Sequence, residues 1–336
     1  MMKAMVFERH GGVDELNIRD LPVPEIADNE VLVRVRAVAL NGFDPMMLQG
    51  ATGLKTPFPM APCGDFAGEI AQLGAKAGEN WRVGDHVSGY PILPGKGMMG
   101  EVTMGAACEY ILMPASCLVP VPDDVSFEEA AALPVAYGTA LRMMNLRGHV
   151  AEGERVLVLG ATGGVGVAAI QFAKRAGAEV FACGGGDWKL EKLKEIGADH
   201  VIDTGKEDFL TAMRDLAGKP SYDGASEGGV DVVVNYIGGE TWVKSLKMLR
   251  RHGRVLVCGA TAGYDPKTDL RYIWSFEQSI IGSNGWTIED QAKLLELTAS
   301  GDIKPVIHAV RPIEDMPIAM QELIDRKVFG KSVLTL

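Results

Sequence analysis

The sequence has few cysteines, no long apolar run and no cluster of basic residues. Its five cysteines are scattered without a Cys-x-x-Cys pair, which argues against a disulfide framework and a zinc knuckle. No run of about 18 apolar residues occurs, and Glu8 and Arg9 interrupt the apolar start, so we expect neither a membrane span nor a signal peptide. The 33 basic residues face 44 acidic ones, and the net charge of −11 disfavours nucleic acid and anionic membranes as partners. We expect a soluble cytoplasmic protein.

The residues that are present suffice for two packed domains. The chain has 336 residues, of which 47% are hydrophobic and 23% charged, and a domain takes roughly 150 residues. A Val-rich strand is predicted over residues 30–40, and glycine or proline then recurs every few positions up to residue 105. This spacing is typical of short strands and turns, so residues 1–125 are predicted to form a compact β-rich domain.

The pattern changes at Ser126, where Ser126 and Glu129 precede an apolar run and predict the start of a helix. Beyond residue 154, short apolar strands that do not alternate with polar residues are separated by helices, which is typical of a parallel sheet covered on both faces. Strands are expected at 155–160, 179–183, 201–203, 230–236, 254–258 and 279–282, and helices at 165–175, 189–196 and 208–216. Because six strands complete such a sheet, the helices expected at 290–299 and 316–326 and the strand at 332–336 should return to the first domain.

The segment from Gly160 to Gly166 is the strongest functional signal. A short apolar strand runs into Gly-Ala-Thr-Gly-Gly-Val-Gly, which opens a helix of small residues. This arrangement lets backbone N–H groups and a helix N-terminus face a pyrophosphate. The match to G-x-G-x-x-G replaces the first glycine by Ala161. The predicted cofactor contacts at this turn are Ala161, Gly163, Gly164, Val165 and Gly166.

The residues that follow the second strand of the predicted parallel sheet, at 179–183, favour NADPH over NADH. An NAD site usually carries Asp or Glu there to bind the ribose 2′-hydroxyl, whereas this chain has Gly184. Lys189 lies within reach of a 2′-phosphate, and the glycines at 184–186 can present backbone donors to an anion. Asp187 keeps NADH open as the alternative.

With these residues placed, the chain resembles the medium-chain dehydrogenase/reductase superfamily, in its quinone-oxidoreductase and zinc-lacking alcohol-dehydrogenase-like branch. The resemblance runs along essentially the whole chain. It is carried by Asn41-Gly-Phe-Asp44, Pro62-Cys-Gly-Asp65, Val83-Gly-Asp85, Ala130-Ala-Ala-Leu-Pro134, Gly160–Gly166, Gly229-Val-Asp231, Gly253-Arg-Val255 and Gly330-Lys331-Ser332.

The resemblance implies an α/β fold in which a six-stranded Rossmann domain, residues 126–285, is inserted in a GroES-like β-rich catalytic domain made of residues 1–125 and 286–336. It also implies a homodimer, joined through the strand at 279–283.

The resemblance predicts that no metal is bound. Zinc-using members carry Cys where this chain has Asn41, and His followed by Glu where it has Gly64 and Asp65. A catalytic zinc needs three protein ligands, and Asp65 alone remains. Residues 91–107 contain no cysteine, so the structural zinc lobe is missing too.

Without zinc, an alcohol lacks the Lewis acid that stabilises its alkoxide, so we expect an enzyme that reduces quinones or α,β-unsaturated carbonyl compounds with NADPH. By the resemblance, Asn41 faces the substrate with Asp44 beside it, and the alternative is that either side chain only braces the loop. Tyr137, or Tyr90, is the candidate proton donor. Further positions that line the nicotinamide in relatives are Thr139, Asn235, Gly238, Gly259, Ala260, Ser283, Asn284 and Lys331.

Two other functions stay open from the sequence. One is a zinc-independent alcohol or aldehyde dehydrogenase, and the other is an NADPH-binding protein that has kept the fold without catalysis. The expected substrate is a small carbonyl compound or a quinone.

Overall fold

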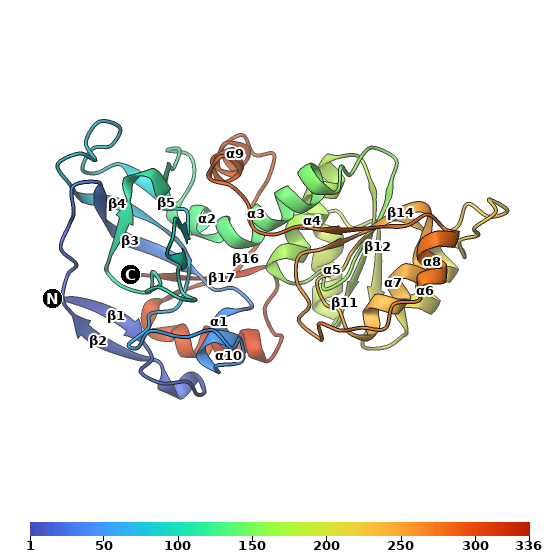
Figure 1. Cartoon of the computed structure of the whole chain (residues 1–336), viewed down its shortest axis with the longest axis horizontal. Helices are drawn as coiled ribbons and strands as arrows, with labels where there is room; N and C mark the ends of the chain where they lie inside the picture. Colours follow the sequence, from blue (N-terminus) through green and yellow to red (C-terminus); the bar gives the residue numbers. More distant parts are fainter. The chain divides into compact units, whose positions relative to one another are not determined.

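The computed structural model describes all 336 residues, which divide into two compact units, each drawn in Figure 1. The first unit comprises Met1–Ala136 and Thr287–Leu336, and the second comprises Tyr137–Trp286. The second unit is therefore inserted between two segments of the first. This confirms the expected fold class, a six-stranded parallel-sheet unit set within a β-rich unit. The domain limits after residues 125 and 285 stay a prediction about where independently folding domains end.

The first unit is built mainly from strands. Its strands are β1 (Met2–Val6), β2 (Asn17–Leu21), β3 (Glu30–Ala39), β4 (Asp65–Leu73), β5 (His86–Gly89), β6 (Ile92–Leu93), β7 (Gly97–Met98), β8 (Tyr110–Pro114), β9 (Leu118–Pro120), β16 (Ile307–Pro312) and β17 (Lys331–Thr335). Its helices are α1 (Asp44–Leu48), α2 (Phe127–Ala132), α9 (Ile288–Ala299) and α10 (Met316–Ile324), with 3₁₀ turns η1 (Val13–Glu15), η2 (Ala115–Cys117) and η4 (Ile313–Asp315). Helix α3 (Pro134–Leu141) crosses the limit between the units.

The main sheet of the first unit joins strands from both ends of the chain. Its order is β16-β17-β3-β4-β5-β9, and β8 also pairs with β3. As expected, the final strand returns to this unit: β17 lies antiparallel to β3 and parallel to β16. The predicted helix start at Ser126 is also present, because the Ser126 hydroxyl accepts the Glu129 N–H at 3.2 Å and caps α2, which packs on β3 and β4.

The second unit alternates strands and helices. Its strands are β10 (Arg155–Val158), β11 (Glu179–Gly184), β12 (His200–Asp203), β13 (Val230–Val234), β14 (Leu249–Val257) and β15 (Ser279–Gly282). Its helices are α4 (Gly164–Arg175), α5 (Asp187–Glu195), α6 (Phe209–Ala217), α7 (Glu240–Met248) and α8 (Leu270–Ser275), and a π-helical segment, η3 (Arg142–Arg147), extends α3.

All six strands of the second unit are parallel, in the order β12-β11-β10-β13-β14-β15. Every residue of β13 is buried, which means that both faces of the sheet are covered. The strand order reverses between β10 and β13, and ligands of such sheets bind beyond the carboxyl ends of the strands at that point. The glycine-rich turn after β10 lies there.

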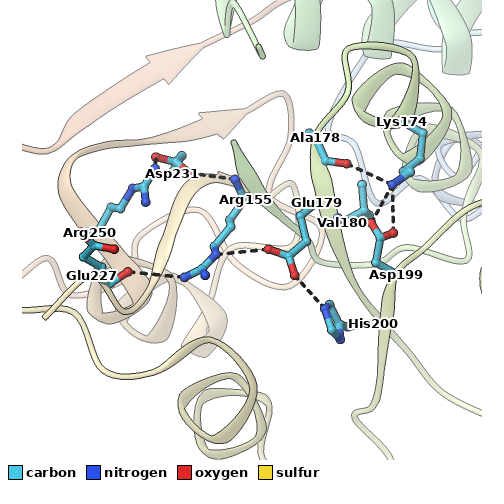
Figure 2. Close-up of polar contacts among 10 residues, drawn as sticks. All are labelled: Arg155, Lys174, Ala178, Glu179, Val180, Asp199, His200, Glu227, Asp231 and Arg250. Atoms are coloured by element: carbon cyan, nitrogen blue, oxygen red, sulfur yellow. Dashed lines mark hydrogen bonds and ion pairs between the residues drawn. The ribbon is translucent and has the colours of Figure 1, made fainter. Parts of the chain in front are cut away.

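The opposite, amino edge of this sheet is charged (Figure 2). Arg155, Glu179 and His200 each begin a strand, and Arg155 Nε donates to Glu179 Oε2 at 3.2 Å while His200 Nε2 lies 2.9 Å from Glu179 Oε1. Lys174, near the end of α4, donates to the Asp199 carboxylate at 2.8 Å. These half-exposed ion pairs close the edge that faces away from the glycine-rich turn. No helix of the chain has both the length and the apolar character needed to cross a membrane.

Candidate functional site

Three polar side chains meet at one end of the main sheet in the first unit. Asn41 follows β3, Asp65 is the first residue of β4, and Lys331 is the first residue of β17. The register pairs Ala39 of β3 with Val333 on one side and with Asp65 on the other. The two antiparallel pairings therefore bring these three strand ends side by side.

The three side chains form a closed hydrogen-bonded cluster, which we call the Lys331 cluster. Lys331 Nζ donates to Asn41 Oδ1 at 2.5 Å and to Asp65 Oδ2 at 3.0 Å, and Asn41 Nδ2 donates to the same Asp65 Oδ2 at 2.8 Å. Lys331 is 2% exposed, Asp65 0% and Asn41 6%. Because burying two charges costs about as much as their attraction returns, such a pair contributes little to stability. Its burial therefore marks it as a candidate functional site.

Asp44 holds the loop that carries Asn41. Asp44 begins α1, and its carboxylate accepts the backbone N–H of Asn41 at 2.6 Å and that of Cys63 at 3.1 Å. Complete burial raises the pKa of Asp44 to about 7, although the two backbone donors and Lys331 act to lower it. Both carboxylate oxygens are thus occupied by the backbone, and Asp44 positions Asn41.

The neighbourhood of Asp65 bears on the zinc prediction. Asp65 Oδ2 is bound by Asn41 and Lys331, and its Oδ1 accepts the Val135 N–H at 3.0 Å. Cys63 is buried, and burial raises the pKa of its thiol well above the usual range. No group of three or more His, Cys, Asp or Glu side chains in the chain is arranged to hold a metal ion. The Asp65 carboxylate instead faces an ammonium group.

The tyrosines that the sequence suggested as proton donors lie in different surroundings. Tyr137 is fully buried in α3, and its hydroxyl accepts a hydrogen bond from Gln171 Nε2 at 3.4 Å. Tyr90 follows β5 and packs, half-buried, against the core of the first unit. A proton-donor role for Tyr137 stays a prediction.

The glycine-rich turn of the second unit joins β10 to α4. Gly160 has a φ of +66°, which glycine adopts without strain. A Cβ on Gly166 would lie 2.4 Å from Gly160 O, so α4 approaches the turn closely because residue 166 has no side chain. Gly163 is the exposed N-cap of α4, and a Cβ there would meet nothing nearer than 3.7 Å. Gly160, rather than Ala161, thus makes the tight turn, and the first helical turn begins with Gly164 and Val165.

Tyr236 belongs to this turn and was missed by the sequence reasoning. Its hydroxyl donates to Gly160 O at 2.5 Å and accepts the Gly166 backbone N–H. Burial raises the pKa of Tyr236 above the ordinary tyrosine range, so the phenol stays protonated. The only available signal was its place two residues after the end of β13, the strand next to β10 in the sheet.

Four further predicted cofactor residues line one cavity of the second unit. Asn235, Gly238, Gly259 and Ala260 surround a cavity of about 320 Å³ beyond the ends of β13 and β14. The Asn235 amide shapes this loop, since its Oδ1 accepts the backbone N–H groups of Ile237 and Gly238 at 3.0 Å. Asn235 therefore acts on the cavity through the backbone that it holds.

The remaining predicted cofactor residues of this unit differ in burial. Ser283 follows β15 and is 7% exposed, and its Oγ has no hydrogen-bond partner. Asn284 is exposed, and Thr139 is half-buried in α3. A buried hydroxyl without a partner is rare, and a bound polar group would satisfy it. Together with the side-chain-free Gly166, Ser283 fits a dinucleotide at this edge of the sheet.

The end of β11 carries the residues expected to choose between the two nicotinamide cofactors. Gly184 ends the strand, and a Cβ there would lie 2.8 Å from Thr162 Cγ2, whereas a Cβ on Gly185 would meet nothing within 4 Å. Lys189, in the first turn of α5, is 6% exposed, and its Nζ lies 5.4 Å from the centre of the Trp188 ring. Burial lowers the pKa of Lys189.

Asp187, the residue that kept NADH open, forms an ion pair with Lys206. Lys206 also lies 3.3 Å from the Asp203 carboxylate at the end of β12. The Asp187 side chain is 82% exposed. The Asp187 carboxylate is thus paired with the Lys206 ammonium group.

Two family models match the chain. One, described as an alcohol dehydrogenase GroES-like domain, matches residues 27–123, and the other, described as a zinc-binding dehydrogenase, matches residues 164–300. The first match lies in the β-rich unit, and the second lies mostly in the parallel-sheet unit.

Named relatives cover nearly the whole chain. A quinone oxidoreductase of Mus musculus is 28% identical over 100% of this chain and 98% of its own. A chloroplastic NADPH-dependent alkenal/one oxidoreductase of Arabidopsis thaliana is 32% identical over 93% of this chain and 73% of its own. A solved structure described as an NAD-dependent alcohol dehydrogenase is 33% identical, with a TM-score of 0.89 and full coverage of both chains.

Two glycine substitutions test the turn. Gly166→Ala should destabilise the protein by roughly 1–3 kcal/mol, because the added methyl group meets backbone atoms that cannot move aside, whereas Gly163→Ala should leave the melting temperature almost unchanged. Gly163→Ala should instead weaken the binding of the nicotinamide cofactor, measured by fluorescence titration, since we expect the pyrophosphate to approach the open side of Gly163. Unchanged cofactor affinity in Gly163→Ala would contradict this location of the site.

Proposed function

Because this chain belongs to the medium-chain dehydrogenase/reductase superfamily, in its quinone-oxidoreductase-like branch, and is an oxidoreductase that uses a nicotinamide cofactor, we propose that it reduces quinones or α,β-unsaturated carbonyl compounds with NADPH and without zinc. The bound cofactor supplies the hydride. The chain's own residues bind the cofactor at the carboxyl edge of the second unit's sheet and offer hydrogen-bond donors to the oxygen of the acceptor.

The Lys331 cluster is the observation that carries this proposal. Oxidation of an alcohol requires either a metal that lowers the pKa of the hydroxyl or a base that accepts its proton. At the positions of the zinc ligands, this chain has an amide and a carboxylate, and the carboxylate already pairs with the Lys331 ammonium at 3.0 Å. An amide and an ammonium are donors, which suit an oxygen that gains negative charge.

The choice of NADPH rests on the end of β11 and on one relative. The strand ends in glycine, with no carboxylate at the position that binds the ribose 2′-hydroxyl in NAD sites. Lys189 offers positive charge nearby, and Asp187 is paired with Lys206. The Arabidopsis relative is named as NADPH-dependent.

A second candidate is zinc-independent oxidation of alcohols with NAD, which the likeness to a solved NAD-dependent alcohol dehydrogenase favours. The experiment that separates it from acceptor reduction is a steady-state comparison of a small quinone, a 2-enal and a primary alcohol with both nicotinamides. We expect kcat/KM for the conjugated acceptors to exceed that for the alcohol by at least about 100-fold, and a zinc chelator to leave the rate unchanged. Equal or faster turnover of the alcohol would reject the proposed function in favour of the second candidate.

The cofactor preference is tested best at Gly185, because a side chain at Gly184 would collide with Thr162. Gly185→Asp should shift the preference from NADPH towards NADH by about tenfold or more, since the new carboxylate repels the 2′-phosphate and can accept from the 2′-hydroxyl. Gly185→Asn is the matched control of similar size without the charge. A wild-type enzyme that binds NADH more tightly than NADPH would refute this assignment of the strand end.

We also propose a homodimer that pairs the β15 edges of two sheets. β15 is the last strand of its sheet, and Ile280 within it is 46% exposed. An exposed apolar edge strand invites pairing with a second chain. Light scattering at micromolar concentration should give twice the mass of one chain, and the mass of a single chain there would count against the dimer.

A further inference from the structure

The Lys331 ammonium has more donors than the protein uses. An ammonium group carries three hydrogens, and protein acceptors take two of them, Asn41 Oδ1 and Asp65 Oδ2. The Asn41 amide likewise has two N–H groups, of which one is bound by Asp65. Each of these two buried donors is therefore held in place by the protein and keeps one hydrogen that can bind an oxygen of a ligand.

The two donors are already arranged around one oxygen. Lys331 Nζ and Asn41 Nδ2 both donate to the same Asp65 Oδ2, and Lys331 also holds Asn41 through Oδ1. This contact determines which way the amide faces, because its oxygen is taken by Lys331 and its nitrogen by Asp65. A fixed ammonium and a fixed amide N–H, preorganised by one carboxylate, are the elements of an oxyanion-binding site.

Stability does not account for the burial of this pair. Other ion pairs of the chain keep contact with solvent, such as Arg254 with Glu154, whose side chains are 16% and 21% exposed. Lys331 and Asp65 are 2% and 0% exposed. A pair closed off to that degree loses the hydration of both ions and returns little net stability.

We propose that Lys331 is the electrophile of the reaction: its ammonium donates a hydrogen bond to the carbonyl oxygen of the acceptor and stabilises the oxyanion formed there. This inference rests on the proposed function. When hydride from the reduced nicotinamide bonds to the β-carbon of an unsaturated carbonyl compound, the C=C π pair shifts to form a new C=C bond at the carbonyl carbon. The C=O π pair moves onto oxygen. A solvent proton then adds to the α-carbon, and Lys331 keeps its own proton.

The first test compares single variants at neighbouring positions of β17. Lys331→Met removes the charge at similar length and should lower kcat for a 2-enone by roughly 10²–10³-fold, as for loss of one oxyanion donor. The Kd for NADPH, measured by fluorescence titration, should rise by a much smaller factor than kcat falls, which separates this role from the nicotinamide contact that the family resemblance implies for Lys331. Ser332→Ala is the control, because Ser332 is equally buried but, as the next residue of β17, points to the opposite face of the sheet from Lys331; it should retain wild-type rates.

A substrate series separates an electrophile from a structural lysine. The loss in Lys331→Met should grow with the basicity of the oxyanion, so it should be smallest for a quinone and largest for a simple enone. An equal loss for all acceptors would overturn the role of Lys331. Lys331→Arg, which keeps a cationic donor, should recover part of the rate on the enone.

A double variant distinguishes activity lost because the protein is destabilised from activity lost because the ammonium donor is missing. Lys331→Met alone leaves Asp65 as an unpaired buried carboxylate, whereas Asp65→Asn combined with Lys331→Met removes both charges. The double variant should regain the wild-type melting temperature and stay inactive on the enone. If it regains activity as well, Lys331 only neutralises Asp65 and the inference fails. A wild-type enzyme that reduces neither quinones nor enones would instead reject the proposed function, and this inference with it.

Discussion

The antiparallel pairing of β17 with β3 is the contact on which the rest of the arrangement depends. It joins the last strand of the chain to the first long one, so the whole parallel-sheet unit is an insertion between two parts of one sheet. The same pairing places Lys331 beside Asn41, 290 residues away in the sequence, and beside Asp65. The buried cluster therefore exists only when both ends of the chain are in register.

The two units differ in where their charged side chains lie and in how exposed these side chains are. In the second unit, charged side chains gather at the amino edge of the sheet, where Arg155, Glu179 and His200 remain partly exposed (Figure 2). The carboxyl edge has glycines, whose backbone can approach an anion. In the first unit, Lys331 and Asp65 of the Lys331 cluster are buried and paired with each other. The carboxyl edge of the second unit's sheet is thus suited to bind phosphates, and the Lys331 cluster is suited to stabilise one developing negative charge.

Much of the fold could be predicted because it depends on local pattern. The apolar strands of the second unit, the glycine-rich turn and the capped start of α2 are each encoded within a few neighbouring residues. Helix α7 was not expected, although its buried Trp242 and Leu246 have the spacing of one helix face, because the helix is only nine residues long. The Lys331 cluster and the contact of Tyr236 with Gly160 could not be predicted, because sheet register and strand order bring together residues far apart in the sequence. Asn41 and Lys331 were both identified, but as separate contacts rather than as partners.

In the proposed reaction, hydride is delivered to the β-carbon of the acceptor while negative charge develops on its carbonyl oxygen. Isotope labelling tests this most directly: the enzyme is supplied with an enone and NADPH deuterated at the transferred position, and the product is analysed by NMR. We expect deuterium at the β-carbon of a saturated ketone, and in heavy water a solvent deuteron at the α-carbon. Deuterium on the carbinol carbon of an allylic alcohol, or none in the product, would contradict the proposed reaction.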